Sequence, residues 1–299
     1  MRSFANWGLS KWLMTTLLLL SCFAATAWSQ LNWEGQTGAL VTPFAYVSGS
    51  KANSIGHPQV SFHFLNTGSV IGNDFQISGT VGLFKFAEVG YTRALSAEGS
   101  SVLSPLFGGG FNIFHGKVNI IPENVHKTKF MPAISVGFVA RTQVKRVFGQ
   151  VTDANQNNGD IYVVGTKTVT QIKSLPFVLS AGLKGTNASI MGIAGNAGDV
   201  NGNATWEARG FGAAAFVLPG PAKSKLVFGS EVAQQPKHLY QLPGPTIPTT
   251  LTYFARIIPP GEVPINFDIG VAQIAGRTLG DVVDLKARHQ VGIGISYRF

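Results

Sequence analysis

Apolar and polar residues alternate through most of the chain after residue 57, and this two-residue period is typical of half-buried β-strands. At the C-terminus, Val291, Ile293, Ile295, Tyr297 and Phe299 alternate with small or polar residues. The same alternation occurs within residues 75–83, 134–141, 177–184, 251–257 and 263–272. Each segment has about ten residues, which is the length that a tilted strand needs to cross a bilayer.

The pattern predicts twelve strands with boundaries good to about three residues. They are residues 58–67, 74–84, 86–95, 109–120, 131–143, 159–171, 175–185, 209–218, 223–233, 249–258, 263–273 and 289–299. Short and long links alternate along most of the chain, as periplasmic turns and outer loops do in bacterial barrels, which also have an even number of strands. We therefore predict an all-β fold: an up-and-down antiparallel transmembrane β-barrel of about twelve strands.

Two alternatives to this architecture stay open. Residues 31–50 would add a strand if they paired with the sheet, and one further unrecognised strand would then give fourteen. Otherwise residues 30–57 form an N-terminal segment that is either a plug inside the barrel or a periplasmic tail, and residues 58–299 form the barrel. A soluble secreted β-sandwich is the alternative outside the membrane class.

The first 29 residues predict a cleaved signal peptide. Arg2 and Lys11 give a basic start, residues 13–27 are uncharged and mostly apolar, and small residues follow at Ala25 and Ala27. The apolar run is shorter than the roughly 20 residues of a spanning helix, so an uncleaved anchor is the weaker interpretation. Cys22 is the only cysteine. It lies in this segment, and lipidation at Cys22 is a second alternative.

The composition changes the picture in the direction of a membrane protein. Charged residues make up only 12% of the chain, whereas a soluble domain has about 25%. No apolar run after Ala27 approaches the length of a spanning helix. A chain this apolar without spanning helices fits a barrel, in which lipid-facing residues alternate with lumen-facing ones. The net charge is +9, but the bases are scattered, so no nucleic-acid partner is predicted.

The last strand ends on Phe299, with Tyr297 two residues before it. Together with Ile293 and Ile295, this ending resembles the C-terminal signature by which outer-membrane barrels of Gram-negative bacteria are recognised and inserted. The resemblance implies an outer-membrane location, contact with outer-membrane lipid, and the barrel-assembly machinery as a partner.

Several glycine-rich segments carry a second resemblance. They are residues 38–43, 82–91, 116–117 and 132–137. They resemble uncharacterised proteobacterial outer-membrane barrels, similar to the YjbH-like barrels associated with exopolysaccharide biosynthesis. The resemblance covers most of the mature chain, and it implies the barrel fold and an association with exopolysaccharide export.

Eight charged side chains are predicted to face the lumen: Glu88, Lys117, Arg141, Lys167, Lys184, Glu231, Arg256 and Asp268. One interpretation is a porin-like channel for small solutes, in which five bases against three acids favour anionic solutes or polysaccharide. The other is a plugged structural or assembly protein, in which these charges pair across a closed lumen. Twelve strands lie between the eight that side chains can fill and the 16–18 of open porins.

No catalytic, cofactor or metal site is predicted. His63, His115 and His126 are the histidines that a hydrolase would use, and His63 follows Ser61 on one strand face. Residues two apart on a strand are about 7 Å apart, which is too far for a hydrogen bond between a nucleophile and its base. We therefore predict that the protein is not an enzyme.

The C-terminal signature leads to a first test. Deletion of Phe299 is expected to lower the amount of folded barrel in the outer membrane, because the assembly machinery would lose the terminal aromatic residue. Quantitative blotting of outer-membrane fractions for the heat-modifiable species measures this. Unchanged levels of folded protein without Phe299 would show that the last strand carries no such signal.

Overall fold

The computed structural model describes residues 30–97, 99–102, 104–125, 128–142, 157–172, 175–241, 246–260, 263–273, 277–278, 283–284 and 290–299. The predicted signal peptide, with Cys22, lies outside the described residues, and so does His126.

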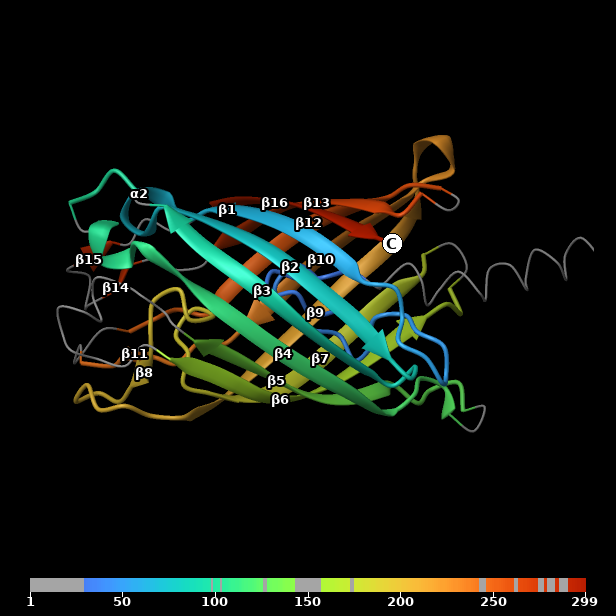
Figure 1. Cartoon of the computed structure of the whole chain (residues 1–299), viewed down its shortest axis with the longest axis horizontal. Helices are drawn as coiled ribbons and strands as arrows, with labels where there is room; N and C mark the ends of the chain where they lie inside the picture. Colours follow the sequence, from blue (N-terminus) through green and yellow to red (C-terminus); the bar gives the residue numbers. More distant parts are fainter. Residues whose placement is uncertain are drawn as a thin grey trace, which may run out of the picture.

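Twelve strands form a closed antiparallel barrel in which β1 pairs with β16 (Figure 1). The strands are β1 (Gln59–Asn66), β2 (Asn73–Leu83), β3 (Ala87–Ala97), β4 (Gly109–Ile121), β5 (Ala133–Thr142), β6 (Asn158–Val169), β7 (Phe177–Thr186), β9 (Glu207–Pro219), β10 (Lys225–Ala233), β12 (Thr250–Ile258), β13 (Ile265–Gln273) and β16 (Gln290–Arg298). Each predicted strand overlaps one of these, so the predicted barrel is confirmed. The soluble β-sandwich is wrong, because the sheet closes on itself.

The two ends of the barrel differ in the length of their connections. Short links such as residues 84–86, together with η3 (Pro221–Lys223) and the C-terminus, lie at one end, called the turn end here. The long links lie at the other, the loop end, on the left of Figure 1. The loop end carries α2 (Gly68–Ile71), η1 (Ser104–Phe107) and two small sheets: β8 (Ala197–Gly198) with β11 (His238–Leu239), and β14 (Arg277–Thr278) with β15 (Val283–Asp284). In the described part of the chain, no helix is long and apolar enough to cross a membrane.

The outer surface of the barrel is apolar. Outward positions carry large hydrophobic side chains on every strand; Ile269 and Ile293, for example, lie opposite each other on β13 and β16 and are 54% and 48% exposed. A continuous apolar surface of this kind is unfavourable in water and is the lipid-facing surface of a transmembrane barrel. Closure of the sheet removes the unpaired strand edges that lipid would not tolerate.

Glycines on the inner face make room for large lumenal side chains. A Cβ atom at Gly182 would collide with the Phe211 ring, one at Gly229 with the Phe254 ring, and one at Gly294 with the His63 ring. Each ring lies over a stretch of wall that has no side chain. These glycines are therefore needed for packing, because the interior has no room for larger residues at these positions.

This packing predicts different effects for two glycines on β7. Gly182→Ala would place a Cβ atom 2.6 Å from the carbonyl oxygen of Val163 and against the Phe211 ring. We expect a loss of about 1–3 kcal/mol in the free energy of unfolding, because an overpacked interior must shift. Gly185→Ala is the control, since its nearest neighbour is 4.0 Å away. Urea unfolding of the folded protein in lipid vesicles gives both values, and equal stability of the two variants would contradict the packing argument.

Candidate functional site

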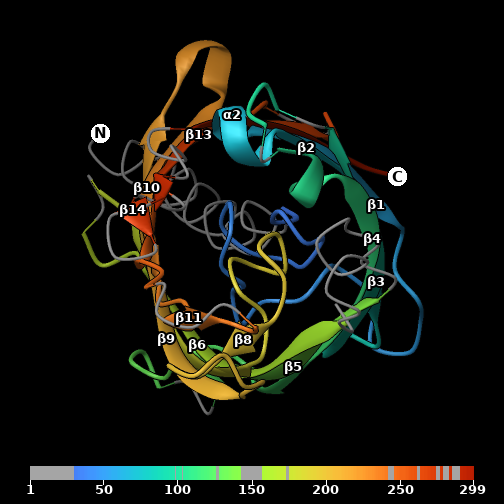
Figure 2. The same cartoon turned by 90° about the vertical axis from the view of Figure 1, so that its left-hand side faces the viewer.

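The N-terminal segment, defined here as residues 30–48, lies inside the barrel (Figures 1 and 2). Residues 30–40 are all buried although they belong to no strand of the wall. The segment is folded by its own hydrogen bonds, in which Trp33 donates to Leu40 (2.7 Å) and Phe44 donates to Thr37 (3.0 Å). The Asn32 side chain caps the turn by accepting from two backbone amides and donating to the Val41 carbonyl. A compact double turn therefore occupies the lumen.

Glu231, on β10, binds one turn of this segment through its main chain. Its carboxylate accepts the backbone amides of Leu40 (3.2 Å), Val41 (3.0 Å) and Thr42 (2.7 Å), and also the Thr42 hydroxyl (2.8 Å). Successive amides that point at one anion form a nest, which compensates a buried negative charge without a basic side chain. Hydrogen bonds to a charged group are worth about 1.5–3 kcal/mol each, so this contact is a strong anchor.

Glu88 and Lys117, paired across β3 and β4, form a second anchor. Their charged groups are 3.0 Å apart and both side chains are fully buried. Glu88 also accepts the Thr37 amide, the Thr37 hydroxyl and the Ser48 amide, while Lys117 donates to the carbonyls of Thr37 (2.9 Å) and Phe44 (2.8 Å). The ion pair therefore binds donors and acceptors of the same loop, which fixes the loop in position.

Arg256 and Asp268, paired across β12 and β13, form the third anchor. The guanidinium donates to Asp268 at 2.8 Å and to the carbonyl of Ala39 at 3.2 Å. Asp268 also accepts a hydrogen bond from the side chain of Gln30. The start of the segment and its central turn are thus bound to the same wall pair.

A four-residue ionic network binds the segment on the opposite wall. Arg141, on β5, contacts Glu34 of the segment and Asp160 of β6 at 2.6 and 2.9 Å. Lys184, on β7, lies 3.7 Å from the same Asp160 oxygen. Two bases therefore compensate two acids, one of which belongs to the segment. Buried charges require such pairing, because an isolated charge in the interior is very costly.

Toward the turn end, hydrogen bonds to Thr166 and Glu123 hold the last part of the segment. The Ala45 amide donates to the Thr166 hydroxyl (2.8 Å), and the Tyr46 hydroxyl donates to Glu123 (3.0 Å) in the β4–β5 turn. Burial raises the pKa of Tyr46 and the nearby Glu123 raises it further, so the phenol keeps the proton that it donates. These contacts hold the segment where it leaves the lumen.

The structure places seven of the eight predicted charges on the inner face of the wall: Glu88, Lys117, Arg141, Lys184, Glu231, Arg256 and Asp268. Lys167 is the exception: it was predicted to face the lumen, but it lies on the outer face of β6. Its neighbour Thr166 points inward to Ala45, while Lys167 lies beside the outward Leu179 and pairs with Glu123 at 3.2 Å. Residues 161–164 are apolar on both faces, so the alternation in β6 did not reveal which face is inside.

Three further acids are buried that were not predicted to face the lumen: Glu34, Asp74 and Asp160. Asp160 stands in β6, where the faces were ambiguous, and Glu34 lies outside the strands. Among the described residues of the wall, four buried or nearly buried inward bases (Lys117, Arg141, Lys184 and Arg256) therefore face five inward acids (Asp74, Glu88, Asp160, Glu231 and Asp268). The predicted excess of bases is therefore not present among these buried wall charges, and Arg209, Lys225 and Glu207 stand at further inward positions of β9 and β10.

The histidines that were considered for catalysis lie in the wall. His63 and Ser61 both face inward on β1 and are buried, but neither side chain has a hydrogen-bond partner among the residues that the structure describes. The His63 ring lies against Trp33 of the segment, with ring centroids 5.8 Å apart. His115 accompanies Lys117 on β4 and contacts Thr80. Within the described residues, no group of three or more His, Cys, Asp and Glu side chains is placed to hold a metal ion.

The predicted C-terminal residues lie on the outer surface. Ile293, Ile295, Tyr297 and Phe299 are all partly exposed, and the rings of Tyr297 and Phe299 pack edge to face. The structure thus gives them lipid-facing positions that run from the middle of β16 at Ile293 to the turn end at Phe299, and their role in assembly stays a prediction.

The fold and the site define a transmembrane β-barrel of the outer-membrane type whose lumen holds its own N-terminal segment. The chain belongs to the family described as protein of unknown function (DUF3034), whose model matches residues 27–254. That description contains no link to exopolysaccharide, so this part of the resemblance stays a prediction. None of the curated proteins compared with the chain matches it.

Solved outer-membrane channels are among the similar structures. The KdgM porin has a TM-score of 0.45 and 8% identity, covering 81% of this chain and 99% of its own. The NanC porin has a TM-score of 0.46 and 8% identity, covering 81% and 100%. An outer-membrane channel from Pseudomonas putida F1 has a TM-score of 0.43 and 7% identity, covering 87% and 100%. Similarity at this level carries no inference about function.

The amide nest around Glu231 leads to a prediction. Glu231→Ala removes the acceptor of three backbone amides and one hydroxyl, and a buried donor left without a partner costs about 1–3 kcal/mol. We expect hydrogen exchange of the amides in residues 37–45 to become at least 10-fold faster, while the strand amides stay protected. Glu207→Ala is the control, because Glu207 pairs with Arg209 at the loop end. Equal exchange in the two variants would show that Glu231 is not an anchor.

Proposed function

We propose that the protein is an outer-membrane channel for small solutes that its own N-terminal segment holds closed. Residues 30–48 fill the lumen between the charged side chains of the wall, and conduction requires their displacement. The observation that carries the proposal is the set of anchors at Glu88, Lys117, Glu231 and Arg256, which bind the main chain of the segment.

The size of the barrel supports this proposal. Wall side chains can fill the interior of an eight-stranded barrel, but a barrel of twelve strands is wider and needs additional material to close it. Here that material is one covalently attached segment, joined to β1 by residues 49–58. The Gly56 amide of this link donates to Gly82 at the turn end, which gives the segment a fixed point outside the lumen.

The chemistry of the interface supports displacement rather than permanent filling. A buried ion pair is rarely more stable than apolar residues of the same volume, because desolvation offsets the attraction between the charges. A permanently solid barrel would therefore gain little from Lys117, Arg141 and Arg256. Charges on the wall are favourable when water enters the lumen, which is the condition of an open channel.

The lumen charges favour weak selectivity. With the segment displaced, the four inward bases and five inward acids named above nearly cancel. We therefore propose small hydrophilic solutes without strong charge preference. The preference for anionic solutes or polysaccharide, and the link to exopolysaccharide export, have no support from the lumen beyond the sequence resemblance.

The alternative is a plugged structural or assembly protein that never opens. The extent of the anchoring favours it, since the segment is bound on opposite walls of the barrel. Both interpretations share two further proposals: outer-membrane lipid covers the apolar exterior, and the barrel-assembly machinery binds the strand that ends at Phe299.

Conductance separates the two interpretations. In a planar bilayer, we expect the wild-type protein to give little current and the Glu88→Ala, Glu231→Ala double variant to give discrete steps, because two anchors of the segment are lost. In this variant four inward bases face three remaining inward acids, so the ion selectivity of these steps should be close to one or slightly anionic. A correctly folded double variant without current, together with a folded but silent variant lacking residues 31–46, would support the structural alternative.

A reversible lock makes the test specific for the segment. Ala45→Cys and Thr166→Cys place one thiol on the N-terminal segment and one on β6, in two residues that a hydrogen bond of 2.8 Å from the Ala45 amide to the Thr166 hydroxyl holds together. Added to the double variant, the pair should abolish the current when oxidised and restore it on reduction. If the current does not change on oxidation although mass spectrometry shows the disulfide, ions pass by another route.

A further inference from the structure

The loop between β7 and β9 folds back into the barrel from the loop end (Figure 2). Its tip, residues 187–196, carries Ile190, Met191 and Ile193, which are at most 4% exposed. Loops at the end of a barrel usually face water, so complete burial of an apolar loop tip indicates a specific packing position. This tip is called the inner loop here.

The inner loop has a closed and strained shape. Ser189 donates to Gly195 (2.9 Å) and Ala197 donates to Asn187 (2.8 Å), which close the loop on itself. Ile190 and Met191 have positive φ values of 48° and 55°, a region that a β-branched residue rarely adopts. Strain of this kind persists only where the surroundings hold it in place, and it is common in segments that switch between two states.

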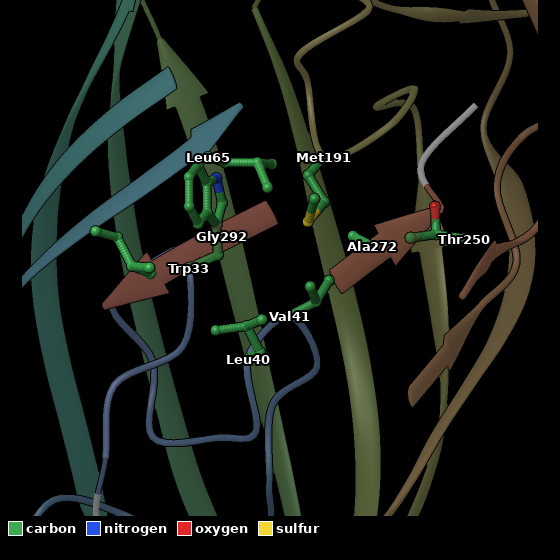
Figure 3. Close-up of a pocket in the computed structure, with 9 residues that line it drawn as sticks. Trp33, Leu40, Val41, Leu65, Met191, Thr250, Ala272 and Gly292 are labelled. Carbon is green, nitrogen blue, oxygen red and sulfur yellow. The ribbon is translucent and has the colours of Figure 1, made fainter. Parts of the chain in front are cut away.

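The inner loop packs on the N-terminal segment through an apolar cluster. The cluster consists of Trp33, Leu65, Val70, Ile71, Ile190, Met191, Ile193, Ile247 and Ala272. Trp33 is the member that the N-terminal segment contributes, Val41 of the same segment packs against the cluster, and the rest comes from the wall and from loops of the loop end. Figure 3 shows Trp33 and Met191 on opposite sides of a cavity of about 10 Å³ that is lined by apolar groups. A cavity of this size barely holds one water molecule, so little space is left between Trp33 and the inner loop.

We propose that the inner loop is a second gate, at the loop end, which Trp33 couples to the N-terminal segment. The role in gating rests on the proposed channel function, whereas the coupling is a property of the fold. Because Trp33 supports the strained tip, withdrawal of the segment removes that support and the inner loop swings out of the lumen. Displacement from one side therefore opens both barriers.

Trp33 is suited to this role by its position. Trp33 belongs to the N-terminal segment, but its side chain lies in the apolar cluster at the loop end and not among the polar anchors. With its side-chain amide in the orientation that satisfies both groups, Gln76 on β2 donates a hydrogen bond to the carbonyl of Trp33 and accepts one from its indole nitrogen. These two contacts orient the ring.

The base of the inner loop is tied to β6, where Asn187 exchanges two hydrogen bonds with Gly159 (2.8 and 3.3 Å) and Asn196 accepts one from Asn158 (3.0 Å). At the tip, the Ile190 amide donates to Gln235 at 3.1 Å, and the apolar side chains pack in the cluster.

Cysteine accessibility tests the coupling without any measurement of current. Met191→Cys is labelled in the folded, vesicle-reconstituted protein with a membrane-impermeant maleimide, and the parent chain gives the background. In the otherwise wild-type protein the thiol is expected to react at least 10-fold more slowly than Val200→Cys, an exposed position on the same connection. Trp33→Ala should bring the labelling rate of Met191→Cys close to that of Val200→Cys.

Phe44→Ala is the matched control. Phe44 is an equally buried aromatic residue of the N-terminal segment, but it packs in a different cluster with Ala39, Val178 and Phe254. Its loss should leave Met191→Cys protected. Trp33→Phe should preserve most of the protection. If Trp33→Ala does not fold, Trp33→Leu serves as the disruptive variant and Trp33→Phe as its conservative counterpart.

The outcomes separate the two proposals. Equal labelling with Trp33→Ala and Phe44→Ala would overturn the coupling, and rapid labelling in the wild-type background would overturn the inner loop as a barrier. If labelling follows Trp33 but no variant conducts, the coupling stands and the channel function fails.

Discussion

The fold depends on one electrostatic constraint: charges that face inward from the wall must be compensated in a lumen from which water is largely displaced. The main chain of the N-terminal segment meets this constraint, because peptide groups provide both donors and acceptors. Three amides bind Glu231, while two carbonyls bind Lys117. The same contacts satisfy the polar groups of a segment that has no regular secondary structure, so the wall and the segment stabilise each other.

The contacts inside the lumen are of two kinds, which differ in how they are stabilised. Around Glu88 and Glu231 the contacts are polar, directional and exchangeable with water. At the loop end, around Trp33 and Met191, they are apolar and depend on burial. Water can replace the partners of the polar contacts when the lumen is wetted, whereas the apolar contacts resist wetting. In the proposed channel, a barrier made of both kinds of contact would block ions and water more completely than either kind alone.

The sequence analysis recovered the strands because a membrane barrel imposes a strict two-residue period on its wall. It recovered most of the inward charges for the same reason, since a charge in an otherwise apolar strand belongs on the wet face. The method failed in β6, where residues 161–164 are apolar on both faces and Lys167 was assigned to the lumen. The inward face of that stretch is apolar because Tyr162 and Val164 pack in the cluster that includes Ala45.

By itself, the sequence determined the number and order of the strands, their faces, the alternation of short turns and long loops, and most of the lumenal charges. These follow from local period and from the cost of placing charge in lipid. Only the tertiary structure decided what those charges bind. It located residues 30–48 between them, revealed Glu34 and Asp160 as partners of Arg141, and folded the loop that carries Ile190 and Met191 onto Trp33. Such contacts join residues far apart in the chain and have no periodicity, so they depend on the shape of the closed barrel.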